Sequence, residues 1–404
     1  MDIALPSEEI SPYDRLYWPD EQLRHCLASG EQRRELTVYL GADAYLELSA
    51  LARTAAAAVR VGDAPRVCLV PGIMGSQLGI PRAGGAPPDL IWLDPIDMIR
   101  GDLYKLALTA DSPVRALGLV HHSYLRLWLR LLAAGFDVRP FAYDWRRDIL
   151  EIGAALAQAI VAGQQPVMLV AHSLGGLVAR AALLDPLADA RVSRVVQLGV
   201  PNKGAIAALL ALRGCYPVVQ RSAMLDRRHS AEQLAREVFA TFTSVQQLRP
   251  DNAGFWRKLP TEDARYRVIA GIGQVTCDAV IGTGEQTRYR YSRAGDGTVS
   301  FDSARLDNAP CYLTRTEHSD LSRDPAVTAT VIDLLRDGQS SRLPRIATHE
   351  PLPVAADQVR IVSATDLALD APQKIDWASW SSEDRRHFLE SLNAPLALPA
   401  LAGL

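Results

Sequence analysis

An apolar run passes through a turn of small residues into a helical pattern at residues 167–180, Val-Met-Leu-Val-Ala-His-Ser-Leu-Gly-Gly-Leu-Val-Ala-Arg. A strand, a sharp turn and a helix in this order form the setting of a nucleophilic serine, usually written Gly-x-Ser-x-Gly. Ser173 stands at the tip of the turn, Ala171 replaces the first Gly, and Gly175 and Gly176 follow. The alternative is an ordinary turn in which Ser173 only caps the helix, since Ser is a favoured N-cap residue.

Two later positions favour the nucleophile over the cap. Asp296 lies between two glycines in the loop Gly-Asp-Gly-Thr-Val at 295–299, although Asp-Gly is also common in simple β-turns. His318 follows the last predicted core strand and precedes a predicted helix. Ser, Asp and His in this chain order are the catalytic triad of an α/β-hydrolase. We expect His318 to take the proton of Ser173, and Asp296 to fix the tautomer of His318.

The negative oxygen that forms during acyl transfer needs two preorganised donors. We expect one donor to be the backbone N–H of Leu174, the residue after the nucleophile. The second is expected from the loop that follows the strand at 66–70, as the backbone N–H of Ile73. A triad and two such donors would complete the machinery of an acyl-transfer enzyme.

Strands and helices alternate along most of the chain, which predicts a mostly parallel sheet with helices on both faces. The predicted strands are 66–70, 137–143, 167–172, 192–200, 265–272 and 310–316, and the main predicted helices are 121–134, 148–161 and 325–336. We expect an N-terminal helical extension (1–63), a hydrolase core (64–336) with cap or lid insertions at about 79–118 and 202–262, and a Pro-rich C-terminal extension (337–404) with one helix at 382–392.

The composition narrows the function classes. The net charge of −3 argues against a nucleic-acid binder, which needs a basic surface. The five cysteines are scattered and form no Cys-x-x-Cys pair, so neither a metal site nor a disulfide framework is indicated, and we expect chemistry without a cofactor. The first nine residues lack the features of a secretory signal, and no run of 18 apolar residues predicts a membrane span. A cytoplasmic location is therefore expected.

Four blocks of the sequence resemble the lecithin:cholesterol acyltransferase family, which includes lysosomal phospholipase A2 and phospholipid:diacylglycerol acyltransferase. The blocks are Val-Pro-Gly-Ile-Met-Gly-Ser-Gln-Leu at 70–78, Ala-Tyr-Asp-Trp-Arg-Arg at 142–147, Val-Ala-His-Ser-Leu-Gly-Gly at 170–176, and 295–299 together with His318. They occur in the family order and span roughly residues 66–336. The resemblance implies a lipid acyl ester as the substrate and an acyl intermediate on Ser173, and we expect Met74, Tyr143 and His172 to bind substrate.

The second block also fits a packed aromatic corner in which Asp144 and Arg146 form a salt bridge. The chain departs from the family's secreted members, because residues 79–118 contain no Cys for a disulfide-bonded lid. Docking on a membrane through that lid is therefore not implied, although a peripheral membrane contact stays an open alternative.

Three function classes follow. The leading hypothesis is a serine-dependent lipid acyl-ester hydrolase of the phospholipase or lipase kind, with an O-acyltransferase that uses an alcohol acceptor as its alternative. A different class is an effector or interaction protein, controlled by a protein partner through residues 337–404. The third is a non-catalytic hydrolase scaffold, which the complete Ser, Asp and His set disfavours.

Overall fold

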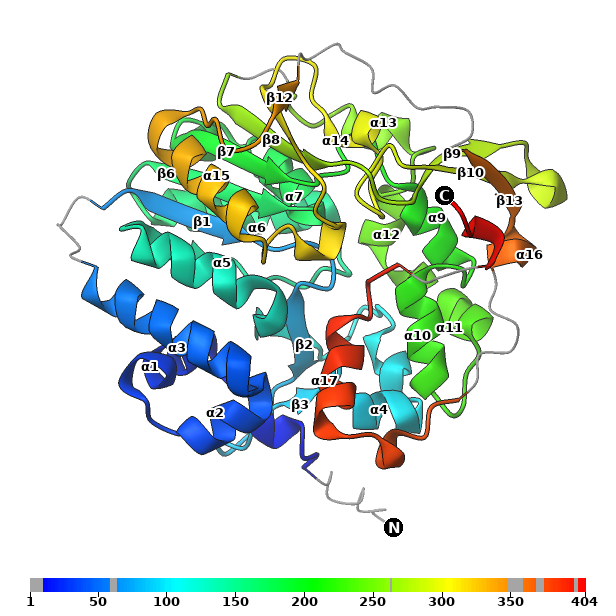
Figure 1. Cartoon of the computed structure of the whole chain (residues 1–404), viewed down its shortest axis with the longest axis horizontal. Helices are drawn as coiled ribbons and strands as arrows, with labels where there is room; N and C mark the ends of the chain where they lie inside the picture. Colours follow the sequence, from blue (N-terminus) through cyan, green and yellow to red (C-terminus); the bar gives the residue numbers. More distant parts are fainter. Residues whose placement is uncertain (1–9, 59–63, 262–263, 347–358, 368–373, 396–398) are drawn as a thin grey trace.

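The computed structural model describes residues 10–58, 64–261, 264–346, 359–367, 374–395 and 399–404. Its centre is a seven-stranded sheet in the order β12-β11-β8-β7-β6-β1-β5, parallel except for the antiparallel β12 at one edge (Figure 1). The strands are β1 (Arg66–Val70), β5 (Asp137–Pro140), β6 (Val167–His172), β7 (Val192–Leu198), β8 (Tyr266–Gly271), β11 (Cys311–Thr314) and β12 (Arg345–Ile346). The mostly parallel sheet agrees with the prediction.

Both faces of the sheet are buried under helices. Along β6, Met168 and Val170 point into one hydrophobic cluster, whereas Leu169 and Ala171 point into the other, as the two-residue period of a strand requires. The first cluster lies under α1 (Asp20–Ser29), α2 (Arg33–Leu40), α3 (Ala42–Ala57), α5 (His121–Ala133) and α15 (Pro325–Asp337). The second contains α6 (Ile149–Ala162) and α7 (Leu174–Ala182). Every described helix is too short or too polar to cross a membrane.

A helical insertion follows β7 and returns to the sheet at β8, within the predicted cap region 202–262. Its helices are α9 (Ile206–Leu212), α10 (Pro217–Leu225), α11 (Ala231–Glu237), α12 (Thr243–Gln247) and α13 (Ala253–Trp256). Apolar side chains from this insertion belong to the same hydrophobic cluster as α6 and α7. The insertion is therefore packed onto the core, beyond the carboxyl end of β7.

Two small antiparallel sheets were not predicted. In the predicted insertion at 79–118, where little regular structure was expected, β2 (Ser76–Ile80) pairs with β3 (Asp89–Leu90) and β4 (Arg115–Leu119), and α4 (Pro95–Arg100) follows β3. The second sheet joins β9 (Thr276–Ile281), β10 (Arg288–Ser292) and β13 (Arg360–Ser363). Each sheet includes one partner distant in sequence, β4 for β2 and β13 for β10, and local periodicity does not reveal that pairing.

The C-terminal region packs against the cap insertion. Lys374 donates to the main-chain oxygen of Ala223 at 2.8 Å, and the N–H of Ile375 donates to Met224 at 2.9 Å, at the end of α10. α17 (Ser382–Glu390) ends two residues before the predicted helix does. Trp377, Phe388 and Leu392 are buried in the cluster that contains the cap helices. The last described elements are short, α16 (Ala364–Leu367) and the 3-10 turns at 377–379 and 399–401.

The Tyr-Asp-Trp-Arg block forms the packed corner that the sequence allowed. The Trp145 indole N–H donates to the carbonyl of Ser76 at 3.0 Å. Arg146 is fully buried and contacts both carboxylate oxygens of Asp144, at 2.8 and 2.7 Å, and its guanidinium also donates to the carbonyl of Leu106 at 2.8 Å. This ion pair therefore fastens the region between α4 and β4 to the loop after β5.

We predict that Arg146→Leu lowers the free energy of unfolding by about 3–5 kcal/mol, because it leaves the carboxylate of Asp144 buried without its main partner. Urea denaturation measures the loss. The matched control is Arg147→Leu, whose side chain is one-third exposed and pairs with Asp144 at 3.3 Å. An exposed ion pair contributes about 0–1 kcal/mol, so equal losses in the two variants would contradict a structural role specific to Arg146.

Candidate active site

Ser173 occupies a strained turn between β6 and α7. Its φ and ψ are +52° and −126°, in a region that residues with a side chain rarely adopt, and its side chain makes no capping hydrogen bond to α7. The helix-cap alternative is therefore wrong. The turn needs glycine after Ser173, because a side chain there would clash with its neighbours. A Cβ atom on Gly175 would lie only 2.4 Å from the carbonyl oxygen of Pro71, and one on Gly176 only 2.1 Å from the side chain of Val200. Strand, loop and helix thus approach as closely as the small residues predicted.

The three predicted triad residues meet at the carboxyl edge of the sheet. His318 Nε2 lies 2.9 Å from Ser173 Oγ, and His318 Nδ1 lies 2.7 Å from Asp296 Oδ2. Asp296 Oδ1 accepts the backbone N–H groups of Thr298 at 3.0 Å and Val299 at 2.7 Å. Asp296 is 1% exposed, so solvent does not reach its carboxylate. The hydrogen bonds from Thr298 and Val299 hold the carboxylate in place toward His318. The geometry suits proton transfer from Ser173 to His318.

The ends of two neighbouring strands leave room for the acid and the base. Gly199 follows β7 with φ +54°, and a Cβ there would lie 2.9 Å from Asp296 Oδ2 and 3.0 Å from His318 Nδ1. Gly271 ends β8, and a Cβ there would lie 2.4 Å from Asp296 Cβ. The N–H of His318 donates to the carbonyl of Asp296 at 2.9 Å, so the two loops are also joined through the backbone.

The loop after β1 runs beside Ser173. A turn from Gly72 to Gly75 is closed by a backbone hydrogen bond of 3.1 Å, and Met74 within it has φ +60°. In the described part of the chain, neither the N–H of Ile73 nor that of Leu174 donates to a protein acceptor. Both N–H groups thus remain free for a substrate oxygen.

The predicted substrate-binding residues have different surroundings. Met74 and His172 line the cavity next to Ser173. Tyr143 does not, because its hydroxyl donates to the carbonyl of Pro71 at 2.6 Å, behind the loop after β1. The structure therefore gives Tyr143 a supporting position in place of the predicted substrate contact. His172 has a hydrogen-bond partner on each ring nitrogen, and burial and the neighbouring His318 lower its pKa to about 3.

A small apolar cavity of about 110 Å³ opens beside Ser173 and His318. The cap contributes most of its apolar wall, including Ala208, Phe239 and Leu248. Ligand sites commonly have volumes of roughly 300–1,000 Å³, so this cavity is narrow. Two residues of the C-terminal region, Glu390 and Asn393, complete its lining.

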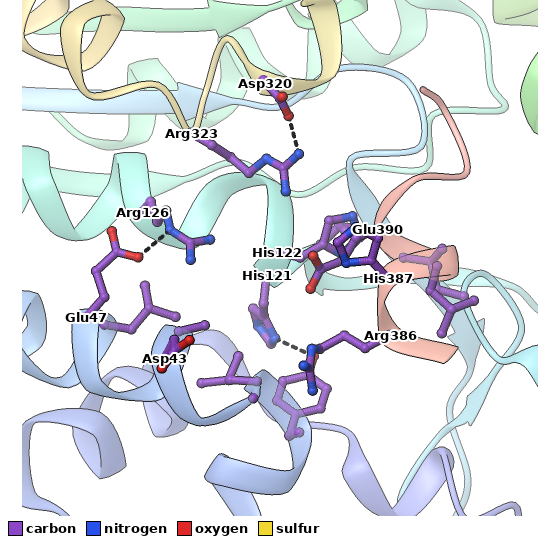
Figure 2. Close-up of a pocket in the computed structure, with 18 of the residues that line it drawn as sticks. Asp43, Glu47, His121, His122, Arg126, Asp320, Arg323, Arg386, His387 and Glu390 are labelled. Atoms are coloured by element: carbon purple, nitrogen blue, oxygen red, sulfur yellow. Dashed lines mark hydrogen bonds and ion pairs between the residues drawn. The ribbon is translucent and has the colours of Figure 1, made fainter. Parts of the chain in front are cut away.

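A much larger groove of about 1,510 Å³, drawn in Figure 2, adjoins this cavity. Its walls come from α3, α5, the loop that follows His318, and α17, and they carry charges of both signs. Figure 2 shows Glu47 paired with Arg126, at 2.8 Å, and Asp320 paired with Arg323. The groove and the apolar cavity share three lining residues, which are His122, Arg323 and Glu390.

Sequence reasoning missed several residues around Ser173. Tyr124, from α5, accepts a hydrogen bond from the N–H of Gly72, lies within hydrogen-bond distance of His172 Nδ1, and lines the cavity. Glu390 and Asn393 come from a region whose composition gave no sign of a site. No local pattern marks such residues, since they reach Ser173 only through the tertiary fold. Among the described residues, no cluster of three His, Cys, Asp or Glu side chains could hold a metal ion.

Residues 131–304 match the protein family described as Lecithin:cholesterol acyltransferase. This match confirms the predicted resemblance, and it includes the blocks at 142–147, 170–176 and 295–299, with Ser173 and Asp296. The loop at 70–78 and His318 lie outside the matched segment. No curated protein matches the sequence.

Several solved structures are similar at low sequence identity. The mature Bacillus licheniformis lipase BlEst2 is 18% identical, with 70% of this chain and 95% of that chain covered and a TM-score of 0.38. Lipase 1 from Pelosinus fermentans is 12% identical, with 69% and 99% covered and a TM-score of 0.39. A chain of the Tle4-Tli4 complex is 12% identical, with 67% and 97% covered and a TM-score of 0.44. With its parallel sheet, the turn at Ser173 and the helical cap, the chain has the predicted α/β-hydrolase fold.

We predict that Asp296→Asn lowers kcat about 10⁴-fold on a soluble short-chain ester. The amide oxygen would keep the backbone donors of Thr298 and Val299, so the NH₂ group would face His318 Nδ1 and impose the wrong tautomer. Asp302→Asn is the matched control, because Asp302 lies in the following helix and its side chain is largely exposed. A kcat for Asp296→Asn within tenfold of the control would rule out Asp296 as the partner of His318.

Proposed function

We propose that this protein is a serine-dependent hydrolase of lipid acyl esters that works through an acyl-enzyme on Ser173. The observation that carries the proposal is the unbroken series of hydrogen bonds from Asp296 through His318 to Ser173, at the wall of an apolar cavity. The family match supports ester hydrolysis or acyl transfer as the general reaction.

In the first half of the proposed reaction, His318 Nε2 takes the hydroxyl proton as Ser173 Oγ bonds to the ester carbonyl carbon. The carbonyl oxygen becomes negative and would be held by the N–H groups of Ile73 and Leu174. When the carbon–oxygen bond of the ester breaks, His318 returns the proton to the departing alcohol. The acyl group is then bonded to Ser173, and His318 is neutral again.

In the second half, His318 removes a proton from a water molecule while the water oxygen attacks the acyl carbon. Collapse of this intermediate breaks the bond to Ser173 Oγ, which regains its proton from His318, and the fatty acid leaves. An alcohol in place of the water would give a new ester. This O-acyltransferase alternative uses the same residues, so the acceptor alone distinguishes the two reactions.

The surroundings of Ser173 support an amphipathic substrate. The cavity wall is mainly apolar and would take an acyl chain, whereas the groove beyond His122, Arg323 and Glu390 is charged and would take the polar end of the same molecule. A lipid ester has both parts. A small polar ester would make little use of the cap.

A second candidate function concerns control by the C-terminal region, and one cluster of contacts favours it. Arg221 of α10 donates to the carbonyl oxygens of Ser391 at 2.6 Å, Leu392 at 3.3 Å, Ala394, and Pro395 at 3.3 Å. We call residues 390–395 the C-terminal strap. Glu390 and Asn393 of the strap line the cavity, and Pro395 lies beside the Asp296 loop, where a Cβ on Gly297 would approach it to 3.3 Å.

Because the strap narrows the cavity, its displacement would admit a longer acyl chain. A protein partner or a lipid surface that binds the C-terminal region would then activate the enzyme. This mechanism would replace the disulfide-bonded lid that residues 79–118 lack.

We predict that Ser173→Ala abolishes hydrolysis of p-nitrophenyl butyrate and labelling by a fluorophosphonate probe, while circular dichroism and thermal unfolding stay close to those of the unchanged protein. Mass spectrometry should place the probe on Ser173. Turnover of a panel of phospholipids and neutral lipids, with and without an added alcohol, then separates hydrolysis from transfer. Undiminished esterase activity in Ser173→Ala would refute the proposal.

We predict that Arg221→Gln raises the ratio of kcat/KM for a twelve-carbon ester to that for a four-carbon ester, because it loosens the strap. The p-nitrophenyl laurate and butyrate esters give this ratio directly. Arg227→Gln, at an exposed position just after the same helix, is the control and should leave the ratio unchanged. If Arg221→Gln and the control have the same ratio, the strap does not limit the cavity.

A further inference from the structure

Two buried side chains connect the halves of the candidate site. His172 is the last residue of β6, and its ring lies 4.8 Å from the ring of His318 between centroids. Tyr124 is 2% exposed and stands near the start of α5, with its ring 5.8 Å from that of His172. Neither residue contacts Ser173 through a hydrogen bond, so the proposed reaction has so far given them no task.

The hydrogen-bond partners fix the position of every proton in this pair. His172 Nε2 lies 3.0 Å from the main-chain carbonyl oxygen of His318, which only accepts, so Nε2 carries the hydrogen. His172 is held neutral, because burial and the adjacent His318 lower its pKa to about 3. Its Nδ1 is therefore bare and accepts the hydroxyl hydrogen of Tyr124 at 2.7 Å. Tyr124 in turn accepts the backbone N–H of Gly72 at 2.8 Å.

The result is a directed series of hydrogen bonds from Gly72 N–H to Tyr124, from Tyr124 O–H to His172, and from His172 N–H to the carbonyl of His318. Gly72 precedes Ile73, whose N–H is the expected oxyanion donor. His318 is the expected base. The series therefore spans the distance between the group that would bind the developing charge and the group that would move the proton.

We propose that Tyr124 and His172 are positioning residues that hold the loop at Gly72–Ile73 and the base His318 in a fixed mutual geometry. The inference rests on the proposed function. Both main-chain polar groups of His318 then have a partner: its carbonyl accepts from His172, and its N–H donates to the carbonyl of Asp296. Tyr124 is a suitable anchor because it belongs to a long helix with a fully buried face, whose residues include Leu125, Trp128 and Leu132.

Under this proposal, a direct hydrogen bond from substrate to His172 is disfavoured. Both of its ring nitrogens are already occupied, and a new hydrogen bond to substrate would require one of them to break. A protonated His172 would in addition oppose the positive charge that His318 gains during the reaction. The surrounding hydrogen bonds favour the neutral ring, which avoids that repulsion.

Tyr124→Phe removes one donor and one acceptor and tests the proposal. We expect kcat for p-nitrophenyl butyrate to fall between about tenfold and a hundredfold with little change in KM, because a misplaced catalytic group slows the chemical step. The matched control is Tyr39→Phe, since Tyr39 makes the same kind of bond, a hydroxyl 3.0 Å from the Nδ1 of His121. Tyr39→Phe loses this one part-buried bond and should keep its kcat, whereas Tyr124→Phe loses its buried bonds to His172 and Gly72 and should lose kcat.

Variants of His172 keep the proposal falsifiable if Tyr124→Phe does not fold. His172→Gln retains an N–H at the place of Nε2 and should keep much of the activity, whereas His172→Leu retains none and should lose at least tenfold more kcat. The rate of fluorophosphonate labelling reports on Ser173 without a natural substrate and should fall in the same order. If the unchanged protein is not labelled, the proposed function fails. If it is labelled and all variants react at its rate, the positioning role alone is overturned.

Discussion

The left-handed backbone of Ser173 is the constraint on which the site depends. Such a conformation costs about 1–3 kcal/mol and persists only where the surroundings hold it. Here β6 lies inside the sheet between β1 and β7, and all nine residues of α7 are buried. Close approach of the loop after β1 to α7 leaves no space for a side chain at Gly175. The energy of the folded core therefore maintains a turn that no local preference would form.

Once that turn is fixed, the strand order determines what reaches it. β1 is the neighbour of β6, so the loop after β1 lies beside Leu174. β7, β8 and β11 follow on the other side, and Gly199 and Gly271 leave the ends of two of these strands open for Asp296 and His318. Parallel strands bring all these loops to one edge, which is where open α/β sheets bind their ligands.

Much of this arrangement was predictable because its signals are local. The alternation of strands and helices, the turn at Ser173 and the acid and base in chain order each occupy one short stretch. The two small sheets around β2 and β10 were not predicted, and each takes one strand, β4 or β13, from far along the sequence. Tyr143 shows the same limit at one residue: its motif placed it near the site, but only the fold shows its hydroxyl bonded to Pro71. Tyr124 and Glu390 had no motif at all.

The C-terminal strap is fastened to α10 by hydrogen bonds from Arg221, and the strength of this attachment decides whether a binding partner could displace it. One guanidinium, that of Arg221, donates to main-chain oxygens of the strap, and the side chain of Leu392 is also buried in the core. A hydrogen bond from a charged group contributes about 1.5–3 kcal/mol, so a few of them hold the strap by several kcal/mol. Micromolar binding of a partner is worth about 8 kcal/mol. A closure of this strength would persist in the free protein and still be reversed by an ordinary binding event, which a disulfide-bonded lid would resist.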